Sequence, residues 1–314
     1  MTPHKSTADQ KATFTDRLAF AALIIIEKLL GLLPCSFVWR IGAALGAAAY
    51  PLSGKRRAIV LHNLGMVHPE ASAEQLAQMS KSVFRNSYAN LLCSLNTSGR
   101  PHRSVEDILI LTDLHNIENI TKDHGAILLL FHMGNWEILT KMHELIPNEN
   151  PVGGMYRPLK NPLIDAHVKK QRESGGSQLF SRKRGLIRAQ KFLKKGGFLG
   201  ILCDQWAGGA GTLTDLFGKE SSITPLPAIL ALKHQCPVIP VSLSTISPGH
   251  WEMRFHEAVH LSPELDKLSA TEQLVKTMED MMKAYSKDIF WMHDRWKIRP
   301  SKRKLARSSK SKSR

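Results

Sequence analysis

The sequence predicts an α/β fold in which a mostly parallel or mixed central sheet is flanked by helices. Residues 126–131 form a short, continuous apolar run, which is typical of a strand buried on both faces. Similar strand candidates are 152–156, 198–203 and 238–244, with a less regular one at 251–256. Helical stretches near 136–146, 161–173, 185–195 and 225–235 separate these runs, and a last helix is expected at about 270–287. Strands that alternate with helices favour a sheet of this kind.

The composition is that of a folded protein with a large core. The chain has 314 residues, 43% of them hydrophobic and 22% charged, and a net charge of +16. Nine of those positive charges lie in residues 297–314, which contain no acid, and the remainder of the chain carries +7. We expect the tail at 300–314 to be disordered, because it has almost no apolar surface to bury. Its charge would suit anionic lipid, nucleic acid or an acidic protein alike.

The N-terminal third contains two apolar stretches. Residues 1–17 are polar and are expected to be disordered, whereas 18–33 are strongly apolar but interrupted by Glu27 and Lys28. That run is shorter than the roughly 20 residues of a bilayer span. We expect residues 18–60 to form helices that anchor the protein on the membrane surface, and residues 61–299 to form the α/β domain. A buried helical hairpin is the alternative.

The second apolar stretch, 37–52, contains Gly42 and Gly46 at a spacing that lets helices approach closely. The basic residues Lys55, Arg56 and Arg57 follow it and would face an anionic leaflet. Residues 72–95 are typical of an amphipathic helix that begins with a capping box.

Polar clusters follow two of the predicted strands. The first is the run from His132 to Glu137 (HMGNWE), and the second begins with Asp204 and Gln205. Ligands of open α/β sheets bind at the carboxyl ends of strands. A neutral imidazole can take a proton from an attacking hydroxyl, and a carboxylate on its other nitrogen would hold the tautomer.

A sharp turn would be needed for His132 and Glu137 to converge. Gly134 permits such a turn, and Asn135 is a favoured residue at a helix start. The four cysteines (Cys35, Cys93, Cys203, Cys236) have neither disulfide nor metal-ligand spacing, so neither a disulfide framework nor a metal site is expected.

The run His-Met-Gly-Asn-Trp-Glu is similar to the His-x-Gly-Asn-Trp-Glu signature of the bacterial late lipid A acyltransferases. The resemblance covers roughly residues 18–299 and continues, in order, through Tyr156-Arg157-Pro158, Asp204-Gln205, Leu216-Phe217-Gly218 and Trp291-Met-His293-Asp-Arg295-Trp296-Lys297. Asp294 stands where the family commonly has arginine, which keeps another glycolipid or aminolipid acceptor open as an alternative.

The resemblance implies an acyltransferase at the cytoplasmic side of the inner membrane. It implies acyl carrier protein as the donor, a phosphorylated glucosamine lipid as the acceptor, and no cofactor, because the thioester is already activated. His132 would be the general base, and Glu137 would orient it. Substrate-binding residues would be Asn135, Arg157, Asp204, Gln205, Arg295 and Lys297. In this interpretation no nucleic acid is bound.

The resemblance gives two of these residues more definite tasks. Arg157 would stabilise charge on a phosphate or on the reacting carbonyl, and Asp204 would shape or orient the site. Purely structural alternatives are a salt bridge between Arg157 and Asp204, and a solvated helix end for Arg295 and Lys297. A non-enzymatic membrane- or nucleic-acid-binding protein would explain the basic tail but not the polar clusters.

Overall fold

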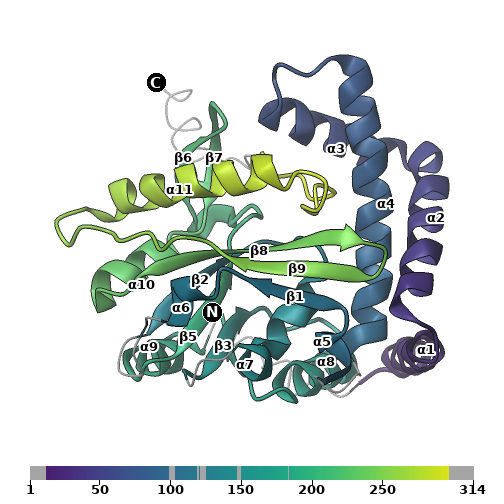
Figure 1. Cartoon of the computed structure of the whole chain (residues 1–314), viewed down its shortest axis with the longest axis horizontal. Coiled ribbons are helices and arrows are strands. Elements are labelled where there is room, and N and C mark those ends of the chain that lie inside the picture. The colour runs from purple at the N-terminus through teal and green to yellow at the C-terminus, as the bar shows by residue number, and fades with distance from the viewer. Residues whose placement is uncertain are drawn as a thin grey trace, which may run out of the picture.

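The computed structural model describes residues 12–98, 103–118, 120, 125–146, 150–182 and 184–296 (Figure 1). The basic tail at 300–314, Lys297 and residues 1–11 lie outside these ranges.

A seven-stranded sheet forms the centre of the protein, in the order β1-β9-β8-β2-β5-β3-β4. Its strands are β1 (Leu109–Thr112), β2 (Ala126–Leu130), β3 (Val152–Tyr156), β4 (Gln178–Ser181), β5 (Phe198–Leu202), β8 (Val238–Ser247) and β9 (His250–Phe255). The five strands from β8 to β4 are mutually parallel, while β9 and β1 run the other way. The predicted α/β fold with a mostly parallel, mixed sheet is confirmed. All five residues of β2 are buried, as its apolar run predicts.

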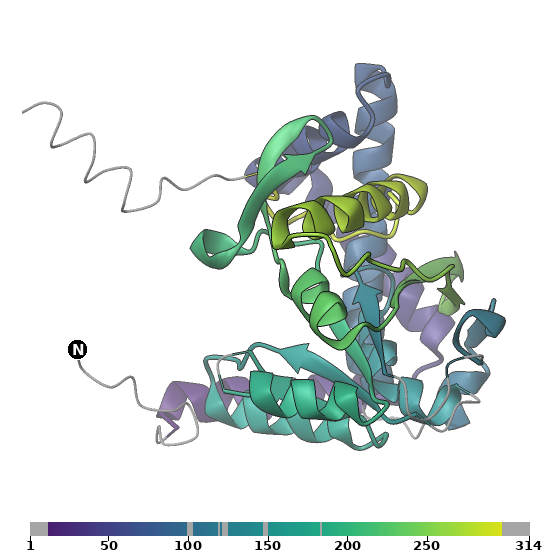
Figure 2. The same cartoon turned by 90° about the vertical axis from the view of Figure 1, so that its left-hand side faces the viewer.

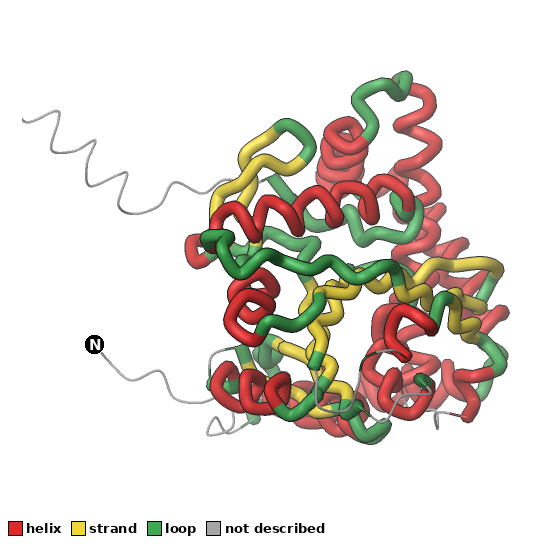
Figure 3. Tube along the Cα trace, turned by 60° about the vertical axis from the view of Figure 1, so that its left-hand side comes forward, coloured by secondary structure: helices red, strands yellow, loops and turns green. Residues whose placement is uncertain are grey.

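Helices flank the sheet, and a separate two-stranded hairpin lies beyond α11 (Figures 2 and 3). The elements are α5 (Arg103–Glu106), α6 (His115–Glu118), η2 (Trp136–Lys141), α7 (Met142–Leu145), α8 (Pro162–Glu173), α9 (Leu186–Lys194), η3 (Gly208–Ala210), β6 (Thr212–Leu216), β7 (Lys219–Ile223), α10 (Leu226–His234) and α11 (Lys267–Ala284). The helix expected at 136–146 is instead a 3-10 segment followed by one α-helical turn. The hairpin β6–β7 packs against α11.

The N-terminal part is helical from residue 14. Its elements are α1 (Phe14–Gly31), α2 (Cys35–Leu52), α3 (Gly54–Val67) and α4 (Ala73–Ser98). A capping box between Thr13 and Asp16 starts α1, so the expectation of disorder up to residue 17 is wrong for the end of that segment. Within the ranges given above, none of the helices combines the length and the apolar character that a bilayer crossing requires.

The helices α1 and α2 differ in burial. No residue of α1 is buried, and Phe14 and Leu29 expose 76% and 59% of their surface. In contrast, α2 buries one stripe against α4. A Cβ at Gly42 would lie 2.5 Å from the Cα of Ala89, and one at Gly46 would collide with the backbone of Phe84. The two glycines therefore permit the close helix contact that their spacing predicts.

Candidate active site

His132 follows β2 in a sharp turn. Gly134 adopts a φ of +53° in this turn, a conformation that glycine reaches without a steric penalty. Residues 288–290, which precede Trp291, form backbone hydrogen bonds with this turn. The N–H of Phe290 donates to the carbonyl of His132 at 2.8 Å, and the N–H of Gly134 donates to the carbonyl of Asp288 at 3.1 Å. These bonds fix the backbone that carries the imidazole.

Asp204 is the partner of His132. It follows β5, which pairs in parallel with β2 so that Leu130 and Leu202 are neighbours. The adjacent strand ends bring Oδ1 of Asp204 within 2.8 Å of Nδ1 of His132. The Asp204 side chain is 2% exposed and that of His132 is 23% exposed. Nε2 of His132 has no hydrogen-bond partner among the described residues, so it can meet a substrate.

The electrostatics of this pair favour a charged carboxylate and a basic imidazole. Burial opposes the charged form of His132, yet the attraction and hydrogen bond of Asp204 outweigh it, so the pKa of His132 is raised. Burial likewise opposes the charge on Asp204, but His132 holds the pKa of that carboxyl below its usual value. An ionised Asp204 accepts a hydrogen bond from Nδ1–H of the neutral ring, which leaves Nε2 free to accept a proton.

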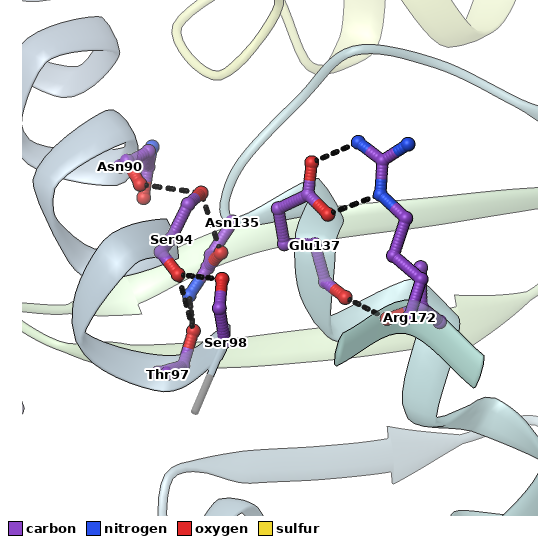
Figure 4. A network of polar contacts seen from close by, with 8 residues as sticks. Asn90, Ser94, Thr97, Ser98, Asn135, Glu137 and Arg172 are labelled. Atoms are coloured by element: carbon purple, nitrogen blue, oxygen red, sulfur yellow. Dashed lines mark hydrogen bonds and ion pairs between the residues drawn. The ribbon is translucent and has the colours of Figure 1, made fainter. Parts of the chain in front are cut away.

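Glu137 contacts a different partner. It lies in the first turn of η2, and its two carboxylate oxygens accept from Nε and Nη2 of Arg172 on α8 at 2.8 and 2.7 Å (Figure 4). The prediction that Glu137 orients His132 is therefore wrong in its geometry, because Asp204 makes that hydrogen bond. Glu137 lies close enough to contribute a smaller upward effect on the pKa of His132. The sequence gives no pattern that singles out Arg172 among the cations of α8.

Asn135 is part of a buried polar network with α4 (Figure 4). Its side chain is fully buried. Oδ1 accepts from the hydroxyl of Ser94 at 2.8 Å, and Nδ2 donates to that of Thr97 at 3.0 Å. The side chain makes no capping hydrogen bond to η2. Asn135 thus stands at the start of η2, as predicted, but does not cap it with its side chain. The predicted substrate contact is corrected, since α4 occupies both ends of the amide. Asn135 instead attaches the loop to α4.

An apolar cavity lies beside the loop. It has a volume of about 240 Å³ and is lined by α1, α4, η2 and α8. Apolar wall residues include Leu23, Leu91, Leu95, Ile164 and Val168. Glu137 and Arg172 supply charged groups to the lining. Trp136 also lines the cavity, and its ring lies 5.7 Å from the imidazole of His132. The indole ring of Trp136 therefore lies between the apolar cavity and the imidazole of His132.

Apart from Asp204, none of the predicted site residues in the described ranges makes a hydrogen bond or ion pair with His132. Arg157 follows β3, is exposed, and makes no ion pair with the described residues, so the alternative of a bridge to Asp204 is wrong. Gln205 follows Asp204 and is half-buried. Lys297 lies outside the described residues.

The surroundings of Arg295 match neither of the two roles considered for it, which are a substrate contact and a solvated helix end. It is 1% exposed, and its Nη1 donates to the hydroxyl of Ser221 at 2.7 Å and the carbonyl of Ser222 at 3.2 Å. Burial lowers its pKa to about 10. This position corrects both the predicted substrate contact and the solvated helix end, because the guanidinium is enclosed against β7. The run from Trp291 to Lys297, here called the closing motif, instead brings His293 towards the site. Nε2 of His293 accepts from the N–H of Trp206, two residues after Asp204, at 3.3 Å.

A buried carboxylate behind a histidine, at the carboxyl edge of an α/β sheet, is an arrangement typical of enzymes that use an imidazole for proton transfer. The family model described as "Bacterial lipid A biosynthesis acyltransferase" matches residues 7–298, and the chain belongs to this family. It is therefore an acyltransferase.

Three curated relatives illustrate the range of similarity. The chain is 25% identical over 274 residues to the lipid A biosynthesis lauroyltransferase of Escherichia coli (strain K12), covering 85% of this chain and 88% of that protein. It is 22% identical over 276 residues to the palmitoleoyltransferase of the same organism, covering 85% and 87%. A lipid A biosynthesis acyltransferase of Haemophilus influenzae is 24% identical over 261 residues, covering 82% and 78%.

Proposed function

We propose that this protein transfers a fatty acyl group from acyl carrier protein to a hydroxyl of a lipid A precursor, with His132 as the general base. The observation that carries the proposal is the His132–Asp204 pair beside an apolar cavity. The relatives, which are named as lipid A biosynthesis enzymes, support the choice of acceptor.

The reaction follows from the position of the free imidazole nitrogen. Nε2 of neutral His132 takes the proton of the acceptor hydroxyl as its oxygen attacks the thioester carbon. The C–S bond then breaks, and the leaving thiolate takes the proton from the imidazolium. Asp204 stabilises that imidazolium while remaining ionised. The thioester supplies the activated carbonyl, and the protein residues named here supply only proton transfer and positioning.

The apolar cavity is the proposed site of the acyl chain. Its wall suits a hydrocarbon, and Arg172 at its lining can stabilise negative charge that develops on the carbonyl oxygen. This assigns to Arg172 the task that the family resemblance implies for Arg157, because Arg157 does not line the cavity. Glu137 holds the guanidinium in place through two charge-assisted hydrogen bonds.

Membrane attachment is proposed to involve α1 and α2. The exposed apolar residues of these helices are Phe14, Leu18, Ile25, Ile26, Leu29, Leu32, Phe37, Leu45 and Leu52. A surface of this kind partitions into the headgroup region of a bilayer. We place it at the cytoplasmic face of the inner membrane, where an anionic leaflet would also attract Lys55. Replacing Leu18 and Leu29 with aspartate is expected to reduce binding to phosphatidylglycerol vesicles.

A related acceptor stays as the second candidate. Arg295 is enclosed against β7, so the closing motif offers no guanidinium to a phosphate at this position. An acceptor without phosphate would need no such cation. Assays on a panel of acceptors separate the two candidates, and activity confined to lipids without phosphate would exclude the lipid A precursor.

The first test is acyl transfer from acyl carrier protein to a tetra-acylated lipid A precursor. Wild type should form product, and His132→Ala should lose at least about 10³-fold in rate, as expected for removal of a general base. An unchanged thermal midpoint would show that the variant is folded. If the folded variant keeps the wild-type rate, His132 is not the base.

A further inference from the structure

The helix α9 presents a basic surface that the catalytic site does not use. Residues 174–203 contain seven Lys or Arg and no acid, between Glu173 and Asp204. Its described basic side chains are all exposed, and we refer to them as the α9 surface: Arg182, Arg184, Arg188, Lys191, Lys194 and Lys195. A positive surface without interspersed acids attracts an anionic partner over a distance of about 10 Å at 0.1 M salt.

The α9 surface is attached to a rigid part of the fold. Ala189, Phe192 and Leu193 of α9 are buried against the sheet. The guanidinium of Arg188 lies over the ring of Phe180 at 6.0 Å. The cationic side chains therefore project from a helix whose position is fixed, which is a requirement for a specific protein contact.

One end of the α9 surface lies at the same sheet edge as His132 and Asp204. The backbone N–H of Arg182 donates to the carbonyl of Tyr156 at 2.9 Å, where β3 and β4 end. Its Nη2 reaches the carbonyl of Ala207, three residues after Asp204, at 3.5 Å. A partner bound to this surface would thus have one end next to the catalytic pair.

A protein fits this surface better than a bilayer does. The exposed apolar residues that suit a membrane gather on α1 and α2, and these helices lie at the opposite end of the molecule from α9 (Figure 1). On α9, Ile187 is 71% exposed among arginine and lysine side chains. A small apolar centre with a charged rim is the usual composition of a protein interface.

We propose that the α9 surface is the docking site of the acidic carrier protein that delivers the acyl thioester. This inference rests on the donor proposed above and adds the place where the donor binds. Carboxylates of the carrier would pair with the α9 cations, and its thioester arm would enter the site along the strand ends near Arg182.

The test is a triple charge reversal, Arg184→Glu, Arg188→Glu and Lys191→Glu, in the full chain. The matched control reverses three exposed lysines elsewhere, Lys219→Glu, Lys267→Glu and Lys276→Glu, and changes the net charge equally. Binding of acyl carrier protein is measured by fluorescence anisotropy, and turnover is measured in parallel. The α9 variant should bind the carrier at least about tenfold more weakly, with a matching rise in KM for the carrier only, because surface charges govern such encounters. The control should stay within about twofold of wild type.

The outcomes separate the two proposals. If wild type binds and uses the carrier while the α9 variant does so equally well, the docking site is wrong and the proposed function stands. If wild type neither binds nor uses the carrier, both the donor and the docking site are wrong. Loss of binding to phosphatidylglycerol vesicles with unchanged carrier affinity would show that α9 contacts the membrane instead.

Discussion

His132 and Glu137 bind different partners on different elements of the fold, although only four residues separate them in the sequence. His132 turns towards Asp204 at the end of β5, whereas Glu137 turns towards Arg172 on α8. Trp136 lies between them, against the imidazole on one side and the apolar cavity on the other. The run therefore supplies one group for proton transfer and another for the wall of the cavity. Spacing alone would have joined them in a single dyad.

The largest effect on activity is expected from Asp204→Asn. Without the carboxylate the imidazole loses its tautomer control, and we expect a fall in kcat/KM of about 10²–10⁴-fold. The base must be neutral, so the wild-type rate should fall as the pH drops through the raised pKa of His132, above 6.5. Removing Asp204 takes away the main upward effect on that pKa, so the acid limb should move to lower pH. A pH profile of kcat/KM measures both effects, and an acid limb that does not move would remove Asp204 from this role.

A smaller loss of activity is expected from breaking the Glu137–Arg172 pair. Glu137→Gln and Arg172→Met should each lower kcat/KM by about 10²-fold, and the double variant should lose little more, because the two act as a unit. The acid limb should move much less in Glu137→Gln than in Asp204→Asn. A double-mutant cycle on kcat/KM checks the coupling. If the two losses are additive and the acid limb moves as far as in Asp204→Asn, then Glu137 acts on His132 directly.

The smallest effect is expected on stability, from the hydrogen bonds that attach the loop at Asn135 to α4. Ser94→Ala leaves Oδ1 of Asn135 buried without its donor, so we expect the free energy of unfolding to fall by about 1–3 kcal/mol. The control is Ser82→Ala on the same helix, whose hydroxyl donates to the carbonyl of Gln78 within α4. Urea unfolding compares the two variants. Equal stability of both would mean that the network does not hold the loop.

The sequence predicts the parts of the fold that have a strong local pattern. Apolar runs identify β2, β3, β5 and β8, and the strand-end argument places His132 and Asp204 at one edge. The sequence analysis does not identify β1 and β4, which have only four residues each, or β6 and β7, whose residues are largely polar.

The errors within the site have a common physical origin. Arg172 lies 35 residues from Glu137, so no local spacing reveals their contact. Arginines are seldom fully buried, and composition therefore gives no sign that Arg295 is enclosed against β7. In the same way, a capping residue can equally serve a neighbouring helix, as Asn135 serves α4.

The close contact at Gly42 and Gly46 has a practical consequence for preparing this protein. The face of α4 that receives α2 includes Phe84 and Ala89, both fully buried. Cutting the chain before α3 would open that face to water and give an aggregating sample, not a smaller soluble enzyme. Polar substitutions on the outward side of α1, where nothing is buried, are the safer route to working without detergent.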